Sequence, residues 1–308
     1  MQAQRAEGES ATKFFIKNLL AASTAGCVAE IATIPIDTAK VRLQIQGKNI
    51  DPSIKPKYQG FMGTMKTITA EEGPRALYNG LAAGLQRQVL FAGLRIGLYI
   101  PVRNMIAGEL KPGENPTLKT KILAGLCTGA IGISIANPTD VVKVKMQAQA
   151  RSADPSQVKY KGCIDCYSQI IKADGIPGLW VGIIPNILRN SVINAAEIAS
   201  YDQYKQMFLQ YTALPDNMSL HILCGFMAGF TATCFGSPFD VVKTRMMSAA
   251  VPYKGVIDCV SKTIRNEGPM AFYNGFTANF MRIGTWNIVM FVTLEQIKKA
   301  IFPPIKKE

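Results

Sequence analysis

One ten-residue motif occurs three times in this chain and limits its possible folds more than any other feature. It reads PIDTAKVRLQ from residue 35, PTDVVKVKMQ from 138 and PFDVVKTRMM from 238, so the copies begin 103 and 100 residues apart, close to a third of the 308 residues. Two other landmarks keep the same phase: KYQG, KYKG and PYKG begin at 57, 159 and 252, and EGPRALYNG, DGIPGLWVG and EGPMAFYNG begin at 72, 174 and 267. A fixed period indicates a repeat architecture. We therefore predict three equivalent repeats.

Each repeat contains two long segments of apolar and small residues. They span 14–46 and 80–107, 119–149 and 182–209, and 219–248 and 275–302. Each exceeds the roughly 20 residues that cross a bilayer. The mean hydropathy of +0.13 also admits a soluble array of helical repeats. Such an array needs a polar stripe along every helix, whereas stretches such as LAGLCTGAIGISIA carry no charge. The pattern predicts an all-α membrane protein with six transmembrane helices.

The phase of the landmarks also predicts the domain organisation. We expect a polar tail over residues 1–13 and three pseudo-symmetric repeats of about 100 residues, over 14–113, 114–214 and 215–308. Glycines at four-residue spacing, as in Gly125 and Gly129, let helices approach closely in lipid.

Composition argues against several classes of function. The formal net charge of +13 could attract nucleic acid, but no module that interleaves aromatic and basic residues is present, so we expect no nucleic-acid partner. Positive charge on a membrane protein is explained by topology and anionic lipid. No paired catalytic carboxylates, metal-ligand cluster or nucleophilic triad stands out, so we predict neither an enzyme nor a metal site. The seven cysteines are scattered and odd in number, which argues against a disulfide framework.

The repeated motif joins a helix-bending proline to an acid and a base. Proline removes a backbone hydrogen bond, and the aspartate precedes the lysine by three residues, so both lie on one helical face. The pairs are Asp37 with Lys40, Asp140 with Lys143, and Asp240 with Lys243. They could form three weak local pairs. Alternatively, each aspartate reaches the lysine of a neighbouring helix, and a ring of three bridges closes one end of a central cavity, because charges near a membrane face the protein interior.

These residues resemble the mitochondrial carrier family over essentially the whole chain. All three copies fit its signature, P-x-[DE]-x-x-[KR]-x-[KR], and the EG…YNG landmarks look like its short matrix helices. The resemblance implies a multi-pass inner-membrane carrier that works by alternating access. It also implies that the Asp–Lys ring is a matrix gate braced by Gln44 and Gln147, whereas Met247 breaks the pattern.

The family's second network, [FY]-[DE]-x-x-[KR], is only partly present. YDQYK at 201–205 matches fully, LEQIK at 294–298 lacks the aromatic residue, and YIPVR at 99–103 has Ile100 in place of the acid. The resemblance therefore implies a cytoplasmic gate that either is weaker than the matrix gate or rests on other contacts. Its residues are Arg103, Asp202, Lys205, Glu295 and Lys298, and at most two pairs form, Arg103 with Asp202 and Lys205 with Glu295.

Three arginines share one depth in the second helix of each repeat. Arg87, Arg189 and Arg282 each stand 12 residues before this second network, a distance of about 18 Å along a helix. That depth favours a cavity over contact with lipid headgroups. Because arginine binds carboxylate and phosphate bidentately, three guanidinium groups indicate a multiply charged anion as the solute.

The neighbouring positions differ between repeats, which suggests selectivity. Arg95, Glu197 and Met290 are equivalent by phase. Glu197 is a candidate for proton-linked transport, because a buried carboxyl can hold a proton near neutral pH. A permanent pair with an arginine is the equally weighted alternative. Glu30, on the first helix, is a weaker candidate.

Particular stretches place the chain within the family. GLQRQ, NPTDVVKVKMQAQ and NAAEIASYDQYK look most like the uncoupling-protein subgroup, and next most like the oxoglutarate/dicarboxylate carriers. The resemblance assigns anion or nucleotide binding to Arg87, Arg189 and Arg282, with Arg95, Asn194, Glu197 and Trp286 beside them. It implies no cofactor, but a possible purine-nucleotide regulator and bound cardiolipin.

The expected function is therefore the transport of small anions, either dicarboxylates or fatty-acid anions with proton leak. An oxoglutarate/malate-type exchanger is one alternative. The other is a carrier-shaped structural subunit that associates with other inner-membrane proteins.

Overall fold

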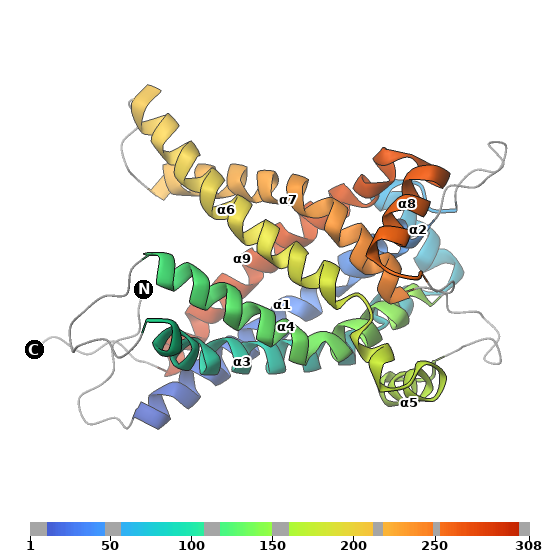
Figure 1. Ribbon diagram of the computed structural model, residues 1–308, viewed down its shortest axis with the longest axis horizontal. Coiled ribbons are helices and arrows are strands. Elements are labelled where there is room, and N and C mark those ends of the chain that lie inside the picture. The colour runs from blue at the N-terminus through green and yellow to red at the C-terminus, as the bar shows by residue number, and fades with distance from the viewer. Residues whose placement is uncertain are drawn as a thin grey trace, which may run out of the picture. The chain divides into compact units, whose positions relative to one another are not determined.

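Six long helices make up most of the part of the chain that the structure describes. The computed structural model describes residues 11–46, 57–107, 118–149, 160–211, 218–248 and 253–301, and within these ranges the regular structure is helical, without strands. The long helices are α1 (Ala11–Ile45), α3 (Leu81–Ala107), α4 (Leu118–Ala148), α6 (Ile183–Tyr211), α7 (Met218–Ser248) and α9 (Phe276–Ile301) (Figure 1). The prediction of two long helices in each repeat is confirmed.

Three short helices follow α1, α4 and α7, but not where the landmarks suggested. They are α2 (Gly60–Glu71), α5 (Cys163–Asp174) and α8 (Val256–Glu267). The EG…YNG runs instead form the 3₁₀ turns η1 (Pro74–Tyr78), η3 (Ile176–Trp180) and η4 (Pro269–Tyr273). Assigning these runs to the matrix helices was wrong. Each run contains a glycine with positive φ, as at Gly73 (φ 82°), which ends the helix before it.

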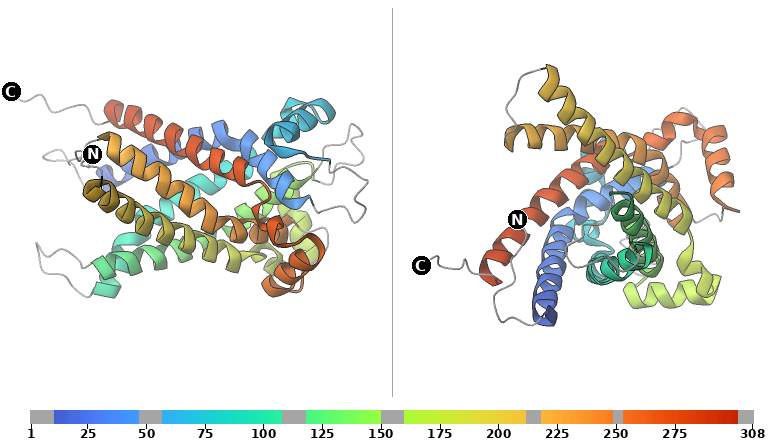
Figure 2. Two further views of the ribbon diagram at one scale, coloured as in Figure 1. Left: turned by 90° about the horizontal axis from the view of Figure 1, so that it is seen from above. Right: turned by 60° about the vertical axis from the view of Figure 1, so that its left-hand side comes forward.

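The short helices gather where α1, α4 and α7 end (Figure 2). A small apolar core joins α2 to η1, because Tyr58, Ile68, Ala76 and Leu77 are buried together. The Thr38 hydroxyl of α1 donates a 2.8 Å hydrogen bond to the Leu77 carbonyl. This contact fixes the turn that leads into α3 against the segment of α1 that carries the motif.

The chain divides into two compact units. The first unit comprises Met1–Ile34, Leu81–Asp140 and Gly284–Glu308, and the second comprises Pro35–Gly80 and Val141–Ile283. Most of the motif residues lie in the second unit.

Close packing of α6 on α7 is the main helix–helix contact in the second unit (Figure 1). Gly236 of α7 faces Ile193 of α6, and a β-carbon at Gly236 would lie 2.5 Å from the Ile193 side chain. Tyr204 and Thr231 share a 2.8 Å hydrogen bond between the same helices. Small residues therefore allow the close approach that helix packing in lipid requires.

One stretch of the described residues, Leu19–Ile45, is long and apolar enough by composition to cross a membrane, with a mean hydropathy of 1.6. Mean hydropathy is an average over all the residues of a helix. Charged residues such as Arg189 and Glu197 of α6 therefore lower the mean hydropathy of their helix.

The glycine before α3 gives a first testable prediction. Gly80 has φ 83°, and a β-carbon there would lie 3.0 Å from the backbone oxygen of Lys143. We expect Gly80→Ala to lower the free energy of unfolding by about 2–4 kcal/mol, because backbone strain and a clash with immobile backbone add together. The thermal unfolding midpoint of the purified protein measures this loss.

Gly73→Ala is the matched control. Gly73 has φ 82°, but a β-carbon added there would meet nothing within 4 Å, so strain alone should cost about 1 kcal/mol. Equal losses in the two variants would contradict the close approach of Gly80 to Lys143.

Candidate functional site

Two of the predicted gate pairs join the first long helices of different repeats. Lys143 of α4 pairs with Asp37 of α1. Lys40 of α1 lies 2.5 Å from Asp240 of α7, with side chains only 6% and 4% exposed. The local alternative, in which each aspartate would bond chiefly to the lysine three residues later, does not describe these two pairs. The third pair, Lys243 with Asp140, would join the two units and stays a prediction.

Gln44 and Gln147 contact the same aspartates. The Gln44 amide donates to Asp240 Oδ2 at 3.1 Å and accepts from the Thr244 hydroxyl at 2.7 Å. The Gln147 amide donates to Asp37 Oδ2 at 3.3 Å. Both glutamines are fully buried, as is Met247, their equivalent on α7. A thioether cannot donate a hydrogen bond, so the third position lacks this contact.

The three arginines also contact the motif aspartates. Arg87 Nε lies 2.5 Å from Asp140 Oδ1, Arg189 Nε lies 2.6 Å from Asp240 Oδ1, and Arg282 Nε lies 3.3 Å from Asp37 Oδ1. In every case the arginine belongs to one repeat and the aspartate to the next, counted cyclically. Asp37 and Asp240 therefore each hold a lysine and an arginine at once.

Two of the three arginine contacts, those of Arg189 and Arg282, are ion pairs with imperfect hydrogen-bond geometry. The Nε atoms of Arg189 and Arg282 are buried and donate no hydrogen bond to any described residue. Their charge is balanced, but part of their capacity for directed hydrogen bonding is unused. An anion of suitable shape can supply those bonds.

The sequence reasoning missed a second layer of ion pairs. Arg42 makes two 3.0 Å hydrogen bonds to Glu72 and a third to the Tyr58 hydroxyl. Arg245 pairs in the same way with Glu267, at 2.5 and 2.8 Å. The signal was present in the sequence, because the last basic residue of each motif and the acid of each EG landmark recur in phase.

The predicted selectivity residues have varied surroundings. Asn194 and Glu197 are exposed on α6, and Trp286 is half-buried on α9. Within the described part of the chain Glu197 contributes no ion pair, whereas Arg189 is held by Asp240. The side chain of Arg95 lies outside the described residues.

Glu30 is buried in the first unit, with 3% of its surface exposed. It accepts a 2.9 Å hydrogen bond from the Gln88 amide. Gly84 lies opposite, and a β-carbon there would come within 2.7 Å of Glu30 Oε1.

The predicted cytoplasmic gate stays a prediction, because both of its pairs would join the two units. Arg103 donates to Asn104 Oδ1 at 2.9 and 3.2 Å. Asp202 and Glu295 are exposed, and Lys205 and Lys298 are partly buried.

Comparison with known proteins assigns the class. The model of the mitochondrial carrier protein family matches residues 11–110, 114–212 and 215–304. This chain therefore belongs to the mitochondrial carrier family, whose members are transporters, and it is a multi-pass protein of the mitochondrial inner membrane.

Within that family the chain is similar to uncoupling proteins. It is 52% identical to mitochondrial uncoupling protein 1 of Arabidopsis thaliana, over 92% of this chain and 93% of the relative. Mitochondrial uncoupling protein 2 of the same plant is 49% identical over 93% of this chain and 94% of its own length. The putative mitochondrial transporter UCP3 of Sus scrofa is 49% identical over 92% and 91%. The predicted uncoupling-protein-like carrier is thus confirmed, and the oxoglutarate/malate exchanger and the structural subunit are not favoured.

Proposed function

We propose that this carrier moves small anions, either dicarboxylates or fatty-acid anions with proton leak, by alternating access. One observation carries the proposal: Arg87, Arg189 and Arg282 hold equivalent places in the three repeats, and each contacts a motif aspartate through an ion pair. The protein's own carboxylates thus occupy the places that a solute carboxylate or phosphate would take. The names of the similar proteins, uncoupling protein and mitochondrial transporter, agree with this function.

Competition between solute and aspartate provides a mechanism for opening. An anion that approaches Arg189 or Arg282 can offer bidentate hydrogen bonds, which the Nε contacts to Asp240 and Asp37 lack. As the arginine turns to the solute, its aspartate keeps only the lysine and the glutamine. The gate is then weaker while the solute is bound, which couples binding to opening, because a ligand shifts a conformational equilibrium only through different affinity for the two states.

Thermal-shift measurements on the purified protein test the proposal. The panel contains dicarboxylates, phosphate, fatty acids, purine nucleotides and neutral analogues of matched size. We expect anions that are carried or that inhibit to raise the unfolding midpoint, because a ligand that binds only the folded state stabilises it. Liposome uptake then separates carried anions from inhibitors. If no anion raised the midpoint and none entered liposomes, the proposal would fail.

Two further ligands belong to the proposal. A purine nucleotide would bind as a regulator through its phosphates, at the arginines that serve the solute. Cardiolipin would contact the short helices, a role supported by exposed apolar residues at their equivalent positions: Met62, Ile164 and Ile257 are 66%, 83% and 85% exposed. Apolar side chains in such positions suit the boundary of a bilayer.

Glu197 gives a prediction about anion affinity. It lies two turns from Arg189 on α6, is exposed, and contributes no ion pair within the described residues. A carboxylate near a bound anion repels it, so removing the charge of Glu197 should raise anion affinity. We expect Glu197→Gln to bind anions more tightly than the wild type and to leave transport measurable.

Binding titrations at neutral pH compare the two proteins. Asn194→Asp, one turn earlier on α6, adds a carboxylate and should weaken anion binding. Equal anion affinities for the wild type and Glu197→Gln would place Glu197 outside the solute site.

A further inference from the structure

The second layer of ion pairs is strong in two repeats and weak in the third. Arg42–Glu72 and Arg245–Glu267 are bidentate and buried, with side chains at most 11% exposed. Their equivalent in repeat 2 is Lys145–Asp174, at 3.6 Å, with Asp174 53% exposed. Both side chains of this pair are shorter than their counterparts. A surface pair of this kind contributes little stability.

The arginines of the strong pairs also tie neighbouring repeats together. Arg42 Nε donates to the Gln147 carbonyl at 2.6 Å, which links repeat 1 to the end of α4 in repeat 2. Arg245 Nε donates to the Gln44 carbonyl at 3.0 Å, which links repeat 3 to the end of α1 in repeat 1. The remaining link, from repeat 2 to the end of α7, falls to Lys145. A single ammonium nitrogen cannot span a carboxylate and a distant carbonyl as a guanidinium fork does.

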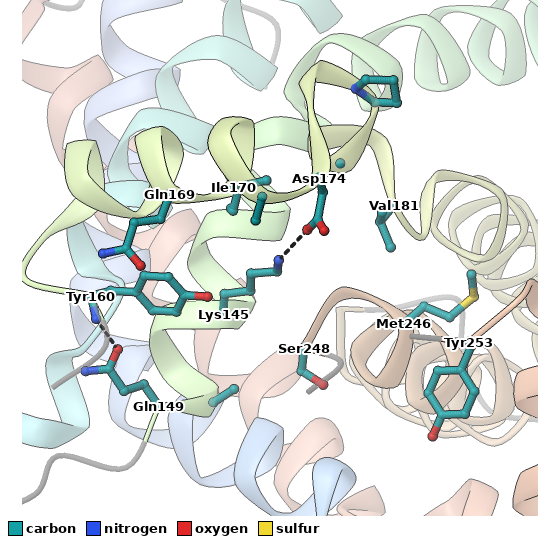
Figure 3. A pocket seen from close by; sticks show the side chains of 14 residues that line it. Lys145, Gln149, Tyr160, Gln169, Ile170, Asp174, Val181, Met246, Ser248 and Tyr253 are labelled. Carbon is teal, nitrogen blue, oxygen red and sulfur yellow. Dashed lines mark hydrogen bonds and ion pairs between the residues drawn. The ribbon is translucent and has the colours of Figure 1, made fainter. Parts of the chain in front are cut away.

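A cavity lies at this remaining link. Its volume is about 670 Å³, and its lining comes from both repeats: Lys145, Tyr160 and Asp174 from repeat 2, and Met246, Ser248 and Tyr253 from repeat 3 (Figure 3). Figure 3 shows Lys145 reaching Asp174 along one side, while Ser248, Met246 and Tyr253 lie across the space. Lys145 and Asp174 are therefore too short to fill the gap between repeats 2 and 3.

A second departure falls on the same junction. Gln44 and Gln147 contact aspartates across the junctions 1–3 and 1–2. The equivalent residue at the junction of repeats 2 and 3 is Met247, which cannot donate a hydrogen bond. The junction of repeats 2 and 3 therefore differs from the other two junctions in two ways. Met247 stands in place of a glutamine, and Lys145 stands in place of an arginine.

We propose that Lys145 and Asp174 set how readily the matrix side opens, and that it opens first between repeats 2 and 3. Both are positioning residues, which act through the contact between repeats and not on the solute. The proposal rests on the alternating-access function proposed above. It predicts that strengthening this one pair slows the carrier without changing its affinity for the solute.

The test builds the missing pair. In the double variant Lys145→Arg/Asp174→Glu, the longer side chains have the cavity to occupy and can reproduce the Arg42–Glu72 geometry. We expect its unfolding midpoint to exceed the sum of the two single effects by about 2 °C or more. The maximal rate of anion uptake into liposomes should fall about threefold or more, while KM changes less than about twofold, because an effect on opening alone leaves solute binding intact. A stabilisation that did not involve opening would leave the maximal rate unchanged.

The reverse exchange in repeat 1 is the matched control. Arg42→Lys/Glu72→Asp copies the weak pair into a strong junction, and it should lower the midpoint and raise the maximal rate. If the repeat 2 variant does not fold, the repeat 1 variant tests the proposal by itself. An unchanged maximal rate in the repeat 1 variant would then overturn the proposal. Additive midpoints in the repeat 2 cycle, or an unchanged maximal rate, would overturn it as well. If the wild type carries no anion, the proposed function fails. The double-mutant cycle of unfolding midpoints would still show whether the residues at positions 145 and 174 interact.

Discussion

Exchanging the charges of Asp37 and Lys143 should restore part of the transport that either single substitution removes. Both side chains are buried, at 9% and 11% exposed. Reversing one charge sets two like charges against each other, and breaking a buried pair costs about 3–5 kcal/mol. We therefore expect Asp37→Lys and Lys143→Asp each to abolish uptake into liposomes and to lower the unfolding midpoint.

The rescue should be incomplete for a structural reason. Asp37 also contacts Arg282 and accepts from Gln147, so a lysine at position 37 faces a second cation even when Lys143 is replaced by aspartate. The same exchange at Lys57 and Glu71, a pair that is about half exposed, should change neither rate nor midpoint, because exposed pairs contribute little. A double variant no better than the worse single would show that Asp37 and Lys143 do not act as a pair.

Replacing Arg87, Arg189 or Arg282 by glutamine should weaken anion binding about ten- to a hundredfold. Hydrogen bonds to charged groups contribute about 1.5–3 kcal/mol, and every 1.4 kcal/mol is about a factor of ten in affinity. The free energy of unfolding should fall less, because Asp37 and Asp240 keep their lysines and glutamines after the arginine is lost.

Titrations of the midpoint against anion concentration measure the affinity, and liposome uptake measures transport. Arg265→Gln, on the exposed face of α8, removes the same charge away from the motif and should bind anions as the wild type does. Unchanged binding and uptake in all three arginine variants would exclude these residues from the solute site.

The positions of the long helices could be predicted because the pattern of each repeat is regular. Long apolar segments and in-phase prolines located α1, α4 and α7 to within a few residues. The short helices were misplaced, because the EG landmark looks like part of a helix but acts as a stop. Its glycine adopts positive φ, and helix and turn propensities alone do not show which side of such a glycine is helical.

The depth of the site could be predicted, but its partners could not. Counting residues along a helix placed Arg87, Arg189 and Arg282 at one level, since the rise per residue is fixed. That count does not give the rotation of each helix or the distance to the next one. The contacts of these arginines with the motif aspartates depend on both. The Arg42–Glu72 pair was missed for a similar reason: its residues recur in phase, but they belong to two separate landmarks, and only the fold shows that they meet.

The hydrogen bond from Arg245 to the Gln44 carbonyl has a consequence for membrane insertion. The Gln44 carbonyl lies at the end of the first long helix. Its hydrogen-bond donor, Arg245, is synthesised about 200 residues later. A chain that has inserted only its first two thirds contains both Arg42 and Gln147, but it lacks Arg245 and so leaves the Gln44 carbonyl at the end of α1 without this donor. The last third supplies Arg245, which donates to this carbonyl. Assembly intermediates should therefore stay open to proteases at the end of α1 until the final pair of helices has entered the bilayer.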